Sequence, residues 1–108
     1  MECEYVLKNN VLRILVPGEL DHHVASQIQQ ETDLLVGTYF IHRIVFDFKN
    51  TEFMDSSGVG LLMGRYRAMG MRKESIRAAG VSRHIDRLLH LSGLHRYIEI
   101  QTAEEEEA

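Results

Sequence analysis

The sequence predicts an α/β fold, a single domain in which helices pack on a mostly parallel β-sheet. Short β-branched and aromatic runs alternate with segments of helical periodicity, and this alternation implies right-handed crossovers between parallel strands. Residues 44–48 are apolar almost throughout, as in a strand that is buried on both faces. The 108 residues are 44% hydrophobic and 26% charged, which is the composition of one globular domain.

The N-terminus is predicted to form a β-hairpin. Strands are expected at residues 4–8 and 11–16, and the Asn-Asn pair between them suits a tight turn. Pro17 is expected to end the second strand, because proline has no amide hydrogen to donate to a sheet ladder.

Three helices are predicted from their start and stop signals. Asp21 can cap the first helix and Gly37 is expected to end it. The second helix is expected over residues 56–69, and the third runs from a Ser82 cap to Gly93. The remaining strands are expected at residues 44–48, 75–79 and 97–101, the last of them at an edge of the sheet.

Composition narrows the classes of function. The net charge of −4 and the lack of a basic stripe argue against nucleic acid as a direct partner. One cysteine gives no disulfide framework, and no cysteine and histidine spacing is of the zinc type. No apolar run approaches the ~18 residues of a membrane span and no signal peptide is recognisable, so we expect a cytoplasmic protein without metal or cofactor. Residues 101–108 are acidic and are expected to form a solvated tail.

Two loops, residues 18–23 and 51–57, are rich in small and acidic side chains. In largely parallel sheets, functional loops lie where a strand is followed by a helix. The second loop ends in Asp55-Ser56-Ser57, where the first amides of the next helix lack intrahelical partners. Ordinary N-capping would explain these residues, and we expect Ser57 to cap the helix while Ser56 stays available.

The helix over residues 56–69 is predicted to have two unlike faces. Its core side would carry Val59, Leu62, Met63, Tyr66 and Met69. The opposite face would carry Ser57, Gly60, Gly64 and Ala68, with Leu61 beside them and exposed. Two glycines inside a helix destabilise it by about 1 kcal/mol each relative to alanine. Such a smooth face favours close packing by a partner, although a neighbouring element of the same domain is the alternative.

Phosphorylation of a serine at the rim of this face would act as a switch. A phosphate adds about −1.5 to −2 charge. It would lie near Asp55 and, if the two loops adjoin, near Asp21. The helix dipole tolerates the added charge locally, whereas an apolar or acidic partner surface does not. The pattern therefore indicates an interface that phosphate turns off.

No catalytic set is recognisable. His22 and His23 are adjacent and would point about 100° apart on a helix, so they cannot chelate a metal together. A serine hydrolase would need a Gly-x-Ser-x-Gly elbow, which is absent. Neighbouring Asp55 and Ser56 cannot form the base-and-orienter relay either. We expect a protein that is not an enzyme and whose histidines are surface or partner contacts.

Four segments between residues 11 and 100 carry a family resemblance. They are Gly-Glu-Leu-Asp-His-His at 18–23, Phe-Met-Asp-Ser-Ser-Gly-Val-Gly at 53–60, Gly-Arg-Tyr at 64–66 and Leu-Ser-Gly-Leu at 91–94. Together they resemble the STAS domain family, and within it the sporulation-type anti-sigma factor antagonists most of all. Arg72-Lys73-Glu74 stands where family members often carry glycines.

The resemblance implies a role in partner switching. Its unphosphorylated members bind an anti-sigma factor that is also a serine kinase, and so free the sigma factor. The kinase uses ATP to phosphorylate the first serine of Asp-Ser-Ser-Gly, here Ser56, and a serine phosphatase restores the active form. Such a protein is a substrate and a ligand, and the free form is expected to be a monomer. Partner contacts are expected at Asp21, His22, His23, Asp55, Ser57, Gly58, Gly60, Leu61 and Gly64.

Three other readings stay open. Within the family, a general-stress antagonist or a stressosome scaffold differs from the sporulation type only through the Asp-His-His and Gly-Arg-Tyr elements. A phosphoaspartate receiver domain would need an acidic cluster after its first strand and a lysine late in the chain. Here that strand ends in Pro-Gly and Lys73 is the last lysine.

Overall fold

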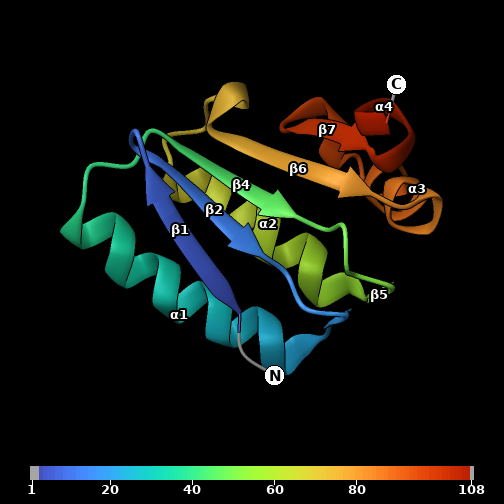
Figure 1. Cartoon of the computed structure of the whole chain (residues 1–108), viewed down its shortest axis with the longest axis horizontal. Coiled ribbons are helices and arrows are strands. Elements are labelled where there is room, and N and C mark those ends of the chain that lie inside the picture. Colours follow the sequence, from blue (N-terminus) through green and yellow to red (C-terminus); the bar gives the residue numbers. More distant parts are fainter. Residues whose placement is uncertain (1–2, 108) are drawn as a thin grey trace.

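A five-stranded sheet organises the chain, of which the computed structural model describes residues 3–107. Its strands, in spatial order, are β1 (Glu4–Lys8), β2 (Val11–Leu15), β4 (Arg43–Asp47), β6 (Ile76–Val81) and β7 (Glu99–Thr102). Only β1 and β2 are antiparallel, and the other three pairs are parallel. The predicted mostly parallel sheet is confirmed, and β7 lies at an edge as expected (Figure 1).

The β1–β2 hairpin closes through Asn9 and Asn10, whose φ angles are 53° and 64°. Asparagine tolerates this left-handed region better than most residues, and two such residues in succession form the turn that matches strand twist. The turn sets the register, with Lys8 opposite Val11. The hairpin prediction is confirmed.

Helices α1 (His22–Thr38) and α2 (Ser56–Ala68) lie side by side, and Figure 1 shows α2 passing behind β4 and β6. Helix α3 (Arg83–Leu91) and the short α4 (Ala103–Glu107) lie on the side of the sheet where β6 and β7 are (Figure 1). Two 3₁₀ turns, at Lys73–Ser75 before β6 and at Leu94–Arg96 after α3, complete the elements. The core fills the space between sheet and helices. It is built from in-register rows of side chains that are at most 1% exposed, namely Leu12, Ile44 and Ile76 in one row and Ile14, Phe46 and Ala78 in the next.

Two predicted ends are wrong. Helix α1 continues through Gly37 to Thr38, because the amide of Tyr39 still donates to the carbonyl of Leu35 (2.9 Å) and nothing forces a left-handed turn at Gly37. Residues 101–107 are not a plain tail, since they complete β7 and form α4. Thr102 and Glu105 exchange side-chain to backbone hydrogen bonds of 3.2 Å, which is a capping box that starts α4.

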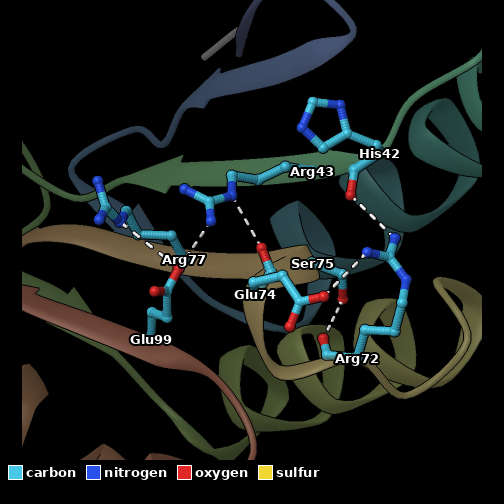
Figure 2. Close-up of polar contacts among 7 residues, drawn as sticks. All are labelled: His42, Arg43, Arg72, Glu74, Ser75, Arg77 and Glu99. Atoms are coloured by element: carbon cyan, nitrogen blue, oxygen red, sulfur yellow. Dashed lines mark hydrogen bonds and ion pairs between the residues drawn. The ribbon is translucent and has the colours of Figure 1, made fainter.

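The connection from α2 to β6 is held by arginines (Figure 2). Arg72 donates to the carbonyl of His42 (3.0 Å) and pairs with Glu74 (3.3 Å). Arg43 donates to the carbonyl of Glu74 (2.8 Å) and pairs with Glu99 of β7 (3.2 Å). The backbone amide of Glu74 and then Arg72 hold the pKa of its carboxyl below the ordinary value. These side chains tie together the N-terminal ends of β4, β6 and β7.

Candidate functional site

A second, two-stranded parallel sheet joins the two predicted loops. It pairs β3 (Glu19–Leu20) with β5 (Phe53–Met54), so that Leu20 lies opposite Met54. The amides of Glu52 and Phe53 donate to the carbonyl of Gly18, at 2.8 and 3.1 Å. The expectation that the two loops lie side by side is confirmed. The sequence did not predict the β3–β5 ribbon itself, because each strand has only two residues.

The ribbon delivers two helix starts to the same place. Asp21 caps α1 by accepting a hydrogen bond from the amide of Val24 (3.0 Å), as predicted. Asp55 caps α2 by accepting from the amide of Ser57 (2.8 Å). The prediction that Ser57 caps α2 is therefore wrong. Asp55 precedes the helix in extended conformation, whereas Ser57 already lies inside the first turn.

Ser56 is the first residue of α2 and its side chain is exposed. Free amides and the positive end of the helix dipole meet at this position, so a phosphate on the Ser56 hydroxyl would be stabilised locally. Because Asp55 performs the capping, the hydroxyl of Ser56 is not required to hold the helix end. The geometry therefore leaves Ser56 available for modification without loss of the helix.

The small-residue face of α2 is partly as predicted. Gly60 and Ala68 are exposed, and Ser57 and Gly64 are half-buried. A methyl group built on Gly60 or Gly64 would meet no atom within 4 Å. The alternative explanation, that these glycines make room for a neighbouring element of the same domain, is therefore wrong.

Leu61 and Gly58 do not belong to an exposed face. Leu61 is only 4% exposed, and Gly58 is buried with Met54 in the way of any side chain, since a Cβ would come within 2.4 Å of the Met54 Cγ. The prediction of an exposed Leu61 assumed one core layer below α2. In the structure α2 packs against the sheet and against α1, so its buried arc is wider and rotated. The buried α2 residues are Gly58, Leu61, Leu62 and Arg65, followed by Met69 at its end.

A groove of about 340 Å³ separates the first turns of α1 and α2. Its lining residues are His22, Ala25, Ser26 and Gln29 from α1 and Ser57, Gly60 and Leu61 from α2. His23 is exposed but is not part of the lining. Of the nine expected contact residues, four line this groove, namely His22, Ser57, Gly60 and Leu61, and Leu61 is buried there instead of protruding.

Arg65 has a role that the helical pattern did not reveal. It is 5% exposed, donates to the Thr32 hydroxyl (3.2 Å) and forms an ion pair with Asp33. These contacts pin α2 to α1 and so set the width of the groove. The sequence held no usable signal for this role, because Arg65 lies four residues after Leu61, on the side of the helix that was expected to be exposed.

Among the side chains that the structure describes, those of residues 3–105, no group of three histidine, cysteine, aspartate or glutamate residues could hold a metal ion. Across the same residues, no helix is both long enough and apolar enough to cross a membrane.

Comparison with known proteins places this geometry in context. The family model of the STAS domain matches residues 3–107. The anti-sigma F factor antagonist of Paenibacillus polymyxa is 32% identical over 100 residues, which cover 93% of this chain and 86% of the relative. The anti-sigma-B factor antagonist of Staphylococcus epidermidis is 27% identical over 112 residues, which cover 99% of this chain and 98% of the relative.

Two solved structures resemble the chain over most of its length. The anti-sigma factor antagonist SpoIIAA in its unphosphorylated form has a TM-score of 0.81 and 28% identity, covering 96% of this chain and 91% of that one. The Bacillus cell fate determinant SpoIIAA in the phosphorylated form has a TM-score of 0.72 and 28% identity, covering 96% and 95%.

Proposed function

Because the chain belongs to the STAS domain family, we propose that it is an anti-sigma factor antagonist switched off by phosphorylation of Ser56. Its unphosphorylated form would bind an anti-sigma factor that is also a serine kinase, and would release a sporulation sigma factor. The observation that carries the proposal is the position of Ser56, exposed at the start of α2 beside the β3–β5 ribbon. SpoIIAA, which this chain resembles, has a phosphorylated form.

The proposed contact surface surrounds Ser56. It comprises Asp21, His22, His23, Asp55, Ser57, Gly60 and Gly64. Gly58 and Leu61 would support this surface from below, since both are buried. The open space beside Gly60 and Gly64 lets a partner backbone approach α2 closely, which accounts for two helix glycines that the domain itself does not need.

The switch would work through charge. A kinase that phosphorylates Ser56 must bring the γ-phosphate of ATP to its hydroxyl. After transfer, ADP and the new phosphoserine hold like charges at close range, and each also loses water in the interface. The phosphorylated form therefore dissociates, and a serine phosphatase would restore binding. The chain acts here as substrate and ligand, with no catalytic residue of its own.

A general-stress antagonist is the second candidate, because relatives of this chain include anti-sigma-B factor antagonists. The sporulation role is favoured by the higher identity to the anti-sigma F factor antagonist of Paenibacillus polymyxa. Calorimetry with the purified anti-sigma F and anti-sigma B factors of the same organism, each loaded with ADP, distinguishes the two. We expect the anti-sigma F factor to bind more tightly, and the reverse order would assign the chain to the stress response.

Phosphosite mapping tests the switch. The chain is incubated with ATP and each anti-sigma factor, and the modified residue is located by mass spectrometry. We expect one phosphate on Ser56, none on Ser56→Ala, and wild-type affinity of Ser56→Ala for the partner. Ser56→Asp should bind at least about 100-fold more weakly, which corresponds to about 2.7 kcal/mol. Phosphate on Ser57, or equal affinities of the two variants, would refute the proposal.

A further inference from the structure

The outer side of the β3–β5 ribbon carries an unexplained aromatic side chain, Phe53. The inner side chains, Leu20 and Met54, are 0% and 2% exposed and belong to the core. Side chains alternate along a strand, so Glu19 and Phe53, which are opposite each other in register, face outward. Phe53 is 46% exposed. Its register partner Glu19 shows that the outward side of the ribbon also accepts a polar residue.

Acidic side chains frame Phe53. Residues 14–23 and 50–57 contain four carboxylates, on Glu19, Asp21, Glu52 and Asp55, and no lysine or arginine. Glu19 and Glu52 are exposed. Lys49, the nearest lysine in sequence, lies 3.9 Å from the carboxylate of the buried Asp47. The surface is therefore an aromatic side chain flanked by the exposed carboxylates of Glu19 and Glu52, only three residues before Ser56.

Aromatic side chains surrounded by polar groups are typical of interface anchors, whereas rim charges mainly steer encounter and fix orientation. The sequence pattern suggests Leu61 for the anchor, but Leu61 is buried. Phe53 meets the requirement that Leu61 fails, because it is exposed, and it lies three residues before the serine that would be modified.

We propose that Phe53 is the apolar anchor of the partner interface, and that the partner is the anti-sigma factor, which receives Phe53 in an apolar pocket rimmed by basic side chains. This inference rests on the proposed function. Charge complementarity to Glu19 and Glu52 argues for a basic rim, and continuity with Ser56 places the pocket beside the kinase centre. The phosphate itself would meet the nucleotide phosphates and not that rim, so an acidic ribbon and an inhibitory phosphate are compatible.

Phe53→Ala is the direct test, with Phe40→Ala as its matched control. Phe40 is 73% exposed and follows α1 near the β1–β2 turn, at the other end of β4 from the ribbon. Binding of each variant to the ADP-loaded anti-sigma F factor is measured by calorimetry. We expect Phe53→Ala to weaken binding at least 10-fold and Phe40→Ala to change it less than 2-fold. Phe53→Leu should recover most of the affinity if apolar contact, and not ribbon geometry, is what matters.

The outcomes separate the possible failures. If wild type binds and is phosphorylated on Ser56 but Phe53→Ala binds equally well, the anchor is refuted and the proposed function stands. If wild type binds no anti-sigma factor, the proposed function fails first. If Phe53→Ala instead abolishes a dimer that light scattering detects in the wild type, Phe53 serves a second copy of this chain and the inference is overturned.

The charged rim is tested separately by association kinetics. The double variant Glu19→Gln/Glu52→Gln should lower the association rate at least 3-fold at low salt. The difference should vanish at ~0.5 M salt, because screening shortens the range of the attraction. Glu104→Gln/Glu105→Gln removes the same charge from α4 and serves as control. Equal rates for the two double variants would refute the basic rim.

Discussion

The two ends of α2 are built in different ways. At its C-terminal end, the connection to β6 is fixed by arginines that donate to backbone carbonyls and pair with carboxylates across three strands (Figure 2). At its N-terminal end, backbone hydrogen bonds of the β3–β5 ribbon and two aspartate caps complete the structure, and Ser56 and Phe53 remain exposed. At the C-terminal end side chains hold the fold, whereas at the N-terminal end mainly backbone hydrogen bonds do, and side chains there remain exposed.

This difference predicts that variants at the two ends separate stability from binding. Changes to exposed side chains near Ser56 should alter partner affinity and leave unfolding nearly unchanged. Changes at the arginine end should alter unfolding and leave affinity unchanged. Leu61 and Gly58, which are buried below the proposed contact surface, should affect stability first and affinity only through the shape of that surface.

Leu61→Ala is expected to have the largest effect on stability. Leu61 is 4% exposed and belongs to the hydrophobic core, so its truncation leaves a cavity and should lower the free energy of unfolding by about 2–5 kcal/mol. Urea denaturation measures the loss, and Leu34→Ala, at a leucine that is 70% exposed, is the control. If Leu61→Ala lowered the free energy of unfolding no more than the control does, Leu61 would be exposed and α2 would be rotated relative to this structure.

Replacing Gly60 or Gly58 of α2 with alanine should change the stability of the free protein in opposite directions. A methyl group at Gly60 meets nothing within 4 Å, so Gly60→Ala should stabilise the free protein by up to about 1 kcal/mol. At Gly58 the methyl group would collide with Met54 and come within 3.0 Å of Leu20, so Gly58→Ala should destabilise by about 1–3 kcal/mol. Thermal melts compare the two. If both variants lowered the melting temperature, the conclusion that a methyl group at Gly60 meets open space would be refuted.

Arg72→Ala should have the smallest effect and only on stability. It removes a hydrogen bond to the His42 carbonyl and an exposed ion pair with Glu74, so the free energy of unfolding should fall by about 1 kcal/mol or less. Affinity for the anti-sigma factor, measured by calorimetry, should stay within 2-fold of wild type. The exposed Arg87→Ala is the control for loss of one positive charge. A large loss of affinity in Arg72→Ala alone would show that the two ends are coupled.

The sequence by itself determined most of the elements, because their signals are local. The Asn9-Asn10 turn, the Asp21 cap, the apolar strand at residues 44–48 and the Gly93 stop each depend on the conformation of a few neighbouring residues. The position of Ser56 at a helix start was predictable for the same reason. The capping box of Thr102 and Glu105 was also readable from spacing, although the acidic run suggested a tail.

Only the tertiary structure decided which side of α2 is buried and which side chains remain free. A helical wheel orders residues by angle but does not say how many neighbours surround the helix. Leu61 is buried on the side of α2 that borders α1, and the sequence does not encode where α1 lies. The β3–β5 ribbon likewise forms between strands too short to show periodicity, and it exists because the loops after β2 and β4 meet. Burial is a property of the assembled layers, so the exposed Phe53 and the buried Leu61 could be told apart only after the fold had formed.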